Sequence, residues 1–591
     1  MMKRFFTSML GALAAIWVSI PVFVILGLLF LGAMVSIGNV EKETVGVSHN
    51  SVLYIDLATT LTDRKSNPDM QSVIYGIEEE TTLLQPTLNA IKRAAFDGRI
   101  SGIFIDAGPL SGGLASVYTL ACAIDDFKKE SGKWVIAYGD NISQSSYLVA
   151  SGATGFYLNP EGMVDIHGLS SDITFYKGLL DKIGVEIQVV KVGTFKSAVE
   201  PYILTEISDA NRLQMEALLN STWSKVSNQI AANRGVTVSD VNAWADSMLI
   251  TQAPESLVER NIVDSLLYRH QAEDMIRDRI GIPQGKDLPL IPIDSYDTTS
   301  PIHGLSKHGN EIAVLYAEGE ISESGKNGIT SDNLVPQILK LAENDDIAGM
   351  VLRVNSPGGS AFASEQIWEA LEQFKAAGKL LYVSMGDYAA SGGYYISCGA
   401  DRIYASPVTL TGSIGIFGLI PNFHGLLTDK LGITQSTVST NKSGSFPNLT
   451  KPLTSFELAS MQNMVNRGYE TFVNRCAEGR DMNVDSIKAI AEGRVWDGTT
   501  ALGIGLVDEL GTLDEAISAI AEEAGLDSYK VVEYPDSKPN IWSILISASR
   551  DLETSVRRHV IGEEAFGIYT EINRISSLRG VQAIAPQLDI Q

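Results

Sequence analysis

A serine surrounded by small residues is the first candidate for chemistry in this sequence. Ser391 lies in GDYAASGG, residues 386–393, between alanines and glycines. Most serines in such a setting cap a helix or form a turn. A serine that attacks a carbonyl group needs two further things, a base that accepts its proton and N–H groups that hold the oxyanion. Both must come from other parts of the chain.

The turn NSPGG, residues 355–359, is the candidate for holding an oxyanion. Gly358 and Gly359 leave backbone N–H groups unobstructed, and the N–H of Gly392, directly after the serine, is a further donor. An ordinary turn is the alternative interpretation of the two glycines. No cysteine and histidine spacing indicates a metal site, so we predict a reaction with no metal and no cofactor.

The candidate base is a lysine in the first half of the chain. Lys196 lies in VVKVGTFKSAVEPY, residues 189–202, where charges are few. A buried lysine has a lowered pKa and, once neutral, can take a proton from serine. Ser413, in TGSIGIFG, is a candidate for orienting this base, although a turn or packing role stays open. The competing bases are His424, which no acidic motif accompanies, and Lys442, which lies in the polar run STNKSGS.

An internal duplication indicates how serine and lysine are divided. A shift of 247 positions lays residues 139–160 on residues 386–407 without a gap, with identical residues at seven positions that include Gly139, Tyr147 and Pro160. Gln144 then takes the place of Ser391. The first copy therefore lacks this nucleophile but retains Lys196, so we predict that one site is assembled from both copies.

Each copy alternates short apolar runs with amphipathic stretches, as in EIAVLYA, GMVLRVN and LLYVSMG of the second copy. This order predicts an α/β fold with crossover connections and a mostly parallel sheet, whose carboxyl edge carries the site. The predicted parts are an N-terminal repeat (45–287), a linker (288–310), a C-terminal repeat (311–538) and a tail with an amphipathic helical pattern (539–591).

The N-terminus indicates a membrane anchor. After Lys3 and Arg4 no charged residue occurs until Glu41, and this stretch exceeds the roughly 20 residues that span a bilayer. Its length favours a retained single-pass helix within residues 1–44 over a cleaved signal peptide. The two basic residues predict a cytoplasmic N-terminus and an extracytoplasmic body. The net charge of -25 and the lack of a basic run argue against a nucleic-acid partner.

The motifs MGDYAASGGYYISCGAD, TLTGSIGIFG and RVNSPGG, with the tandem layout, resemble the signal peptide peptidase A family of the long, duplicated type. The resemblance implies a serine protease of the bacterial inner membrane, with two domains of the fold shared by Clp proteases and crotonases. It implies Ser391 as nucleophile and Lys196 as general base, cleaved signal peptides as substrates, and a homotetramer. Two other classes stay open, a crotonase-like acyl-CoA enzyme and a non-catalytic membrane scaffold.

Overall fold

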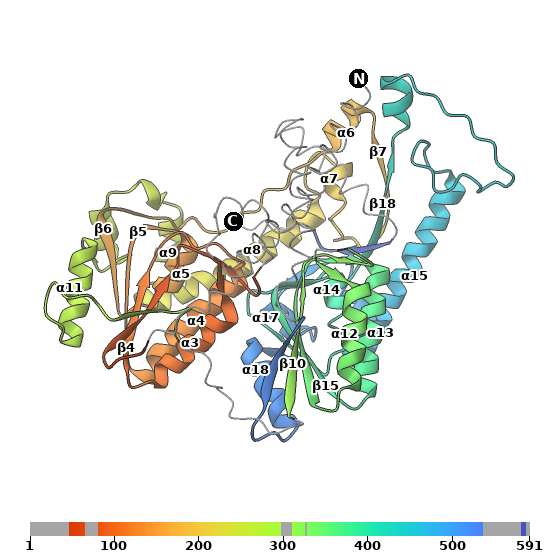
Figure 1. The fold of residues 1–591 in the computed structure, drawn as a ribbon. Helices are drawn as coiled ribbons and strands as arrows, with labels where there is room; N and C mark the ends of the chain where they lie inside the picture. Colours follow the sequence, from red (N-terminus) through yellow and green to blue (C-terminus); the bar gives the residue numbers. More distant parts are fainter. Residues whose placement is uncertain (1–45, 66–80, 297–309, 326–327, 536–580, 587–591) are drawn as a thin grey trace, which may run out of the picture.

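The computed structural model describes residues 46–65, 81–296, 310–325, 328–535 and 581–586. The predicted membrane anchor lies outside these ranges. Within them, no helix combines the length and the apolar character that crossing a bilayer requires. The two copies form separate α/β units, which lie side by side in Figure 1 with the long helix α8 (Asp209–Arg234) between them.

The N-terminal unit is built on a six-stranded parallel sheet. Its inner strands are almost wholly buried apolar runs, as expected for a parallel sheet that is covered on both faces. Across the sheet the strands are β8 (Ser265–Leu266), β6 (Gly155–Val164), β5 (Trp134–Ile142), β4 (Ile100–Asp106), β1 (Ser51–Asp56) and β9 (Leu290–Pro292). Strand β9 thus comes from the start of the stretch expected to link the two copies.

The C-terminal unit repeats this strand order. Its corresponding strands are β20 (Glu509–Leu510), β16 (Arg402–Ala405), β15 (Leu380–Ala390), β13 (Ile347–Ser356), β10 (Glu311–Glu318) and β21 (Lys530–Tyr534). The end of β15 also pairs with β17 (Leu410–Gly412), which pairs antiparallel with β19 (Val495–Asp497). The two copies that the sequence shows thus have sheets with the same strand order.

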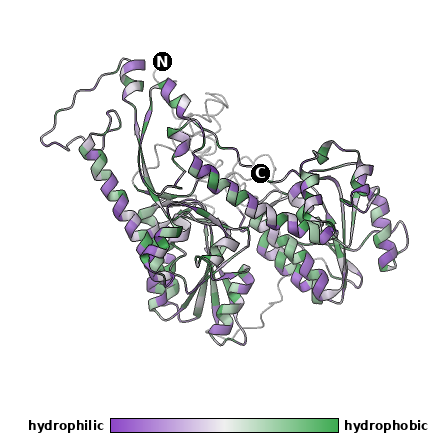
Figure 2. Ribbon diagram, turned by 180° about the vertical axis from the view of Figure 1, so that it is seen from behind, coloured by the Kyte–Doolittle hydropathy of each residue, from purple (hydrophilic) through white to green (hydrophobic). Residues whose placement is uncertain are grey.

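Helices cover both sheets, and in Figure 2 they carry hydrophobic and hydrophilic residues while the strands are mostly hydrophobic. Helices α3 and α12 correspond at the 247-residue shift, as do α4 and α13. The helices of the N-terminal unit are α3 (Leu84–Phe96), α4 (Leu114–Ser131), α5 (Gln144–Ala150), α9 (Val238–Ala245), α10 (Pro254–Glu259) and α11 (Arg269–Ile280). Those of the C-terminal unit are α12 (Ser331–Glu343), α13 (Ala361–Ala376), α14 (Gly392–Tyr395), α15 (Ser455–Gly479), α16 (Val484–Ile490), α17 (Gly498–Gly503) and α18 (Leu513–Glu523).

A third sheet joins the two copies. Strand β7 (Glu186–Val192) of the first copy pairs antiparallel along its whole length with β18 (Ile416–Asn422) of the second. In Figure 1 these two strands rise together from the C-terminal unit, beside α6 (Lys177–Ile183) and α7 (Glu200–Ile203). The same sheet contains β11 (Ile321–Ser322), β12 (Ile329–Thr330), β14 (Gly358–Ser360) and β22 (Gln582–Ile584).

Strand β22 differs from the helix predicted for the tail. The helical pattern lies in SILISASRDLETSVRRHV, residues 543–560, which are outside the described ranges. Residues 582–584 instead pair antiparallel with β14 and β18. Hydrogen bonding to a neighbouring sheet, which no local pattern encodes, decides their conformation.

Two contacts, one buried and one partly buried, hold the units together near the end of β15. Arg353 Nε donates to Asp63 Oδ2 at 2.9 Å, and both side chains are almost inaccessible. Asp387 accepts hydrogen bonds of 2.9 Å from the backbone N–H and the hydroxyl of Ser116. Because Asp387 lies in β15, four residues before Ser391, this contact of the N-terminal unit supports the strand that leads into the candidate nucleophile.

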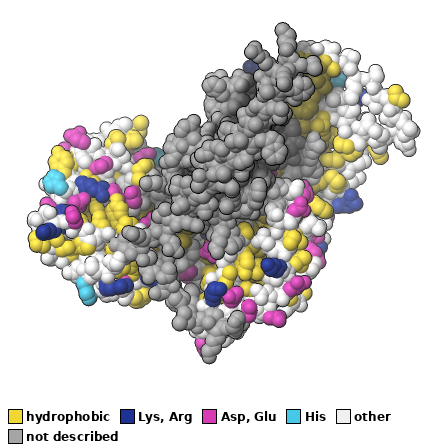
Figure 3. Space-filling model, viewed as in Figure 1, with side chains coloured by type: hydrophobic (Ala, Val, Ile, Leu, Met, Phe, Trp, Pro, Cys, Tyr) yellow, Lys and Arg dark blue, Asp and Glu magenta, His cyan; other side chains and the backbone are white. Residues whose placement is uncertain are grey.

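The charged side chains visible in Figure 3 are interspersed over both units. On the described part of that face, acidic and basic groups alternate without a broad basic patch.

Candidate active site

Ser391 lies at the junction of β15 and α14, where the chain turns sharply. Its φ of 55° and ψ of -112° are unusual for a residue with a side chain, a strain of about 1–3 kcal/mol that the surroundings must offset. The Ser391 N–H donates to Gly412 O at 2.7 Å, which ties the turn to β17. Buried strands and a helix thereby hold the hydroxyl in one place.

Lys196 of the first copy meets this hydroxyl. Its Nζ lies 2.7 Å from Ser391 Oγ, 3.0 Å from Ser413 O and 3.0 Å from Ser413 Oγ. Both Lys196 and Ser391 are 0 % exposed. A neutral amine has two N–H donors and one lone pair, so it can donate to both Ser413 oxygens and accept the serine proton.

Burial favours the neutral form of this amine, which can act as a base. Removal of Lys196 from water lowers its pKa well below that of an ordinary lysine, because the ammonium form loses its hydration. Ser413 Oγ donates in turn to Gly493 O at 3.3 Å, which fixes the hydroxyl beside the amine. The predicted orienting serine therefore lies in direct contact with the predicted base.

The predicted oxyanion groups divide into two kinds. The N–H of Gly358 donates to Ser356 Oγ at 3.1 Å and is thus already engaged. An ideal Cβ built on Gly392 would lie 3.0 Å from Gly359 N, so the N–H groups of Gly359 and Gly392 are neighbours. Gly358 contributes in another way, since its φ of 102° forms the turn and a Cβ there would lie 2.6 Å from Gly392 N.

The alternative bases lie elsewhere. His424 is exposed, and its Nδ1 is 3.2 Å from Thr450 O. Lys442 is also exposed, in a turn, whereas Lys196 is fully buried against Ser391.

In the first copy Gln144 fills the position of the serine, and it makes structural contacts. Its Oε1 accepts from the N–H groups of His167 and Gly168 at 3.0 and 2.9 Å, and its Nε2 donates to Gly168 O. The first copy therefore uses this position to hold a turn.

Several residues that the sequence did not indicate pack around Lys196 or bind the turn that precedes it. A Cβ on Gly493 would lie 2.7 Å from Lys196 Cβ, and one on Gly415 would lie 3.3 Å from Lys196 Cδ. Glu492 binds the turn before the lysine, because its carbonyl accepts from Phe195 N at 2.8 Å and its carboxylate from Thr194 N at 2.9 Å. These residues lie far from Lys196 in the chain, and no local motif marks them.

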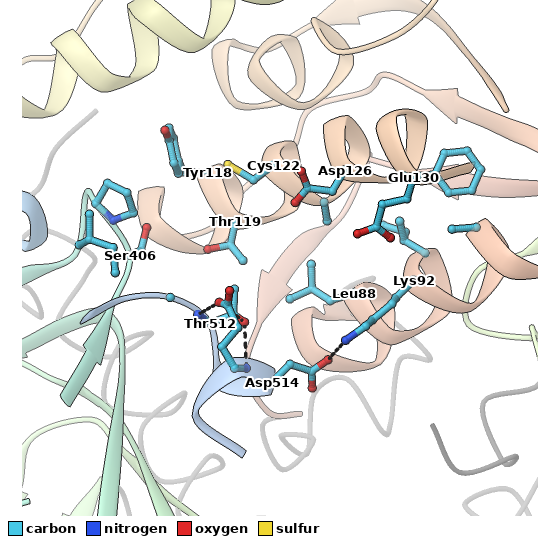
Figure 4. A pocket seen from close by; sticks show the side chains of 18 residues that line it. Leu88, Lys92, Tyr118, Thr119, Cys122, Asp126, Glu130, Ser406, Thr512 and Asp514 are labelled. Atoms are coloured by element: carbon cyan, nitrogen blue, oxygen red, sulfur yellow. Dashed lines mark hydrogen bonds and ion pairs between the residues drawn. The ribbon is translucent and has the colours of Figure 1, made fainter. Parts of the chain in front are cut away.

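A separate cavity of about 450 Å³ lies between the two units (Figure 4). Helices α3 and α4 form one wall, and Ser406, Thr512 and Asp514 lie on the opposite side. Lys92 Nζ is 3.6 Å from Asp514 Oδ2 across it. Neither Ser391 nor Lys196 lines this cavity, so it is not part of the candidate site.

Comparison with known proteins finds the same family in both copies. The profile of Peptidase family S49 matches twice, at residues 127–281 and 373–527, which together make up more than half of the chain. The chain belongs to peptidase family S49. The Clp protease profile also matches, at residues 308–409 of the second copy.

The S49 assignment extends to relatives of similar length. The chain is 33% identical to Protease 4 of Salmonella typhi over 544 residues, covering 89% of this chain and 86% of the relative. It is 32% identical to Protease 4 of Haemophilus influenzae, covering 88% of each chain. The chloroplastic serine protease SPPA of Arabidopsis thaliana is 29% identical over 80% of this chain and 72% of its own.

Among solved structures, a ClpP1 mutant from Listeria monocytogenes matches 34% of this chain and 94% of its own, with 16% identity and a TM-score of 0.24. The family places this chain among serine proteases with tandem S49 regions, which confirms the resemblance drawn from the sequence at the level of the family.

Proposed function

We propose that this S49 protease is an endopeptidase in which Ser391 is the nucleophile and Lys196 the general base. The observation that carries the proposal is the 2.7 Å separation of Lys196 Nζ and Ser391 Oγ, two side chains that are both fully buried. A buried neutral amine can do the work that histidine does in other serine proteases.

The reaction divides into acylation and deacylation. Ser391 Oγ attacks the carbonyl carbon of the peptide while Lys196 Nζ takes its proton. The N–H groups of Gly359 and Gly392 stabilise the oxyanion. As the C–N bond breaks, Lys196 returns the proton to the leaving amine. Water then attacks the ester carbonyl while Lys196 Nζ takes its proton. As the C–O bond to Ser391 breaks, Lys196 returns this proton to Ser391 Oγ, and the carboxyl product leaves.

Ser413 is proposed to position the base. Its carbonyl and hydroxyl oxygens each lie 3.0 Å from Lys196 Nζ and direct the remaining lone pair of a neutral amine toward Ser391. Gly358 is proposed to act through shape, since the turn it forms brings Gly359 beside Gly392.

The substrates are proposed to be cleaved signal peptides and other small apolar peptides. This assignment rests on the sequence resemblance and on the apolar N-terminal stretch, residues 5–40. The same stretch supports a single-pass anchor in a bacterial inner membrane with the protease body outside the cytoplasm. The homotetramer implied by the resemblance belongs to the same proposal.

The test is digestion of a purified signal peptide, followed by mass spectrometry. The wild-type chain should cut it, and Ser391→Ala should leave it intact. Lys442→Ala, which changes an exposed lysine, should cut at the wild-type rate, whereas Lys196→Ala should not cut. Equal digestion by the wild type and Ser391→Ala would contradict the proposed nucleophile.

A further inference from the structure

A strand from the end of the chain lies across the candidate active site. Strand β22 pairs antiparallel with β14, with Gly358 opposite Ile584 and Gly359 opposite Ala583. Its other neighbour is β18, where Phe417 lies opposite Gln582. Strand β22 therefore lies between β14, which contains Gly358 and Gly359, and β18, which pairs with the strand β7 that precedes Lys196.

The backbone pairing is that of an extended peptide bound to a sheet edge. Ala361 N–H donates to Val581 O at 3.2 Å, and Ala585 N–H donates to Pro357 O at 2.7 Å. Hydrogen-bonded pairs alternate along an antiparallel ladder, so Gly359 and Ala583 form the hydrogen-bonded pair between these two. Proteins that bind peptides by strand addition use the same main-chain bonds.

The carbonyl of Ala583 lies where an oxyanion would form. A Cβ built on Gly392 would be 3.1 Å from Ala583 O and 3.0 Å from Gly359 N. A Cβ built on Gly358 would collide with the same Ala583 oxygen. The oxygen thus lies beside the two N–H groups proposed as oxyanion donors. In a peptide bound this way, Ala583 would be the residue whose carbonyl is attacked and Ile584 the leaving residue.

The side chains of this segment are buried or partly buried. Ala583 is 0 % exposed, so no room remains around its methyl group. Ile584 packs against the apolar cluster that contains Phe417 and Tyr202, and Val581 packs against the core of the C-terminal unit. The segment 581–586, VQAIAP, carries no charge. It has the apolar character of the peptides proposed as substrates.

We propose that residues 581–586 are a built-in pseudo-substrate, which fills the peptide groove with Ala583 at the reacting position and competes with incoming peptides. The proposal rests on the proposed function for the identity of the groove. A peptide binds only the fraction of molecules whose groove is empty, so an occupant raises the apparent KM and leaves kcat unchanged. A tail bound nine-tenths of the time raises the apparent KM about tenfold.

The direct test measures binding and does not depend on turnover. The probe is a fluorescent peptide of residues 579–587, RGVQAIAPQ, titrated against Ser391→Ala chains that end at residue 580 or at residue 586. The chain ending at 580 should bind the probe at least tenfold more tightly than the chain ending at 586, which keeps β22. Equal affinities, or no binding to the shorter chain, would overturn the proposal.

A point substitution guards against misfolding of the shorter chain. Ala583→Arg in the full-length Ser391→Ala chain cannot fit the enclosed site of Ala583, so it should expel the tail and expose the groove to the probe. A matched probe with arginine at the same position should bind none of these chains. If Ala583→Arg binds the RGVQAIAPQ probe no better than its Ser391→Ala parent while its melting curve is native-like, the proposal is wrong.

Turnover separates this proposal from the proposed function. With Ser391 intact, the chain ending at 580 should have an apparent KM about tenfold below that of the chain ending at 586, with similar kcat. Active chains with equal KM would refute the pseudo-substrate alone. Loss of turnover from every chain, with the binding difference retained, would refute the proposed function and leave the occupied groove established.

Discussion

Replacement of Lys196 by methionine tests two effects of this amine, its role in turnover and its effect on the free energy of unfolding. The side chain is fully buried, and methionine has a similar unbranched shape, so the packing should change little. No base then remains beside Ser391 Oγ, which is 2.7 Å from Lys196 Nζ in the parent. We expect turnover to fall by about 10⁴- to 10⁶-fold, the loss seen when a nucleophile–base unit is broken.

The same substitution should remove a pH dependence from the stability of the fold. Burial lowers the pKa of Lys196 in the folded chain, so the unfolded chain binds the proton more readily. The free energy of unfolding therefore rises with pH from the lowered pKa up to the ordinary lysine value of about 10.4. Each pKa unit of this depression costs about 1.4 kcal/mol of stability below that range. Lys196→Met removes the cost and its pH dependence.

The assay combines peptide turnover with urea denaturation from neutral to alkaline pH. Lys442→Met is the control, because Lys442 is exposed and both its turnover and its stability should match the parent. Substantial turnover by Lys196→Met, or a lower stability with the parent's pH dependence, would refute the argument that a buried neutral amine serves as the base.

Three further changes test the surroundings of the site. Gly493→Ala puts a Cβ 2.7 Å from the backbone of Lys196 at a φ of 77°. Turnover should therefore drop at least tenfold, and the free energy of unfolding measured in urea should drop by about 1–3 kcal/mol. The control Gly503→Ala, which has open space around it, should change neither quantity. Arg353→Met leaves Asp63 buried and unpaired and should cost about 3–5 kcal/mol in the same assay; an unchanged midpoint would argue against this contact between the units. A chain that begins at residue 45 should stay in the aqueous fraction and keep its turnover. An inactive but well-folded product would contradict the expectation that residues 1–44 only anchor the protein in the membrane.

The sequence carries enough information to predict the sheets and the proximity of Ser391 and Lys196. Apolar runs alternate with amphipathic stretches in both copies, and a parallel sheet with crossover helices is what such an order can form. The pairing of Lys196 with Ser391 follows from the duplication, since Gln144 replaces the serine in the copy that retains the lysine.

Other features depend on contacts that no local pattern encodes. Gly493 and Gly415 approach Lys196 only because β7 and β18 pair across the two copies. The engagement of the Gly358 N–H by Ser356 depends on the geometry of one turn. The strand at residues 582–584 forms because β14 and β18 offer it partners. Pairing at such separations is set by the folded sheet and not by neighbouring residues.

The rate at which a serine-directed phosphonate labels the protein, measured against pH, tests the central claim most directly. The account predicts a single adduct, mapped to Ser391 by mass spectrometry, whose rate of formation rises toward alkaline pH as Lys196 becomes neutral. Lys442→Met should be labelled at the parent rate and Lys196→Met far more slowly. An adduct on another residue, or labelling of Ser391 that is equally fast without Lys196, would contradict a site in which this lysine activates this serine.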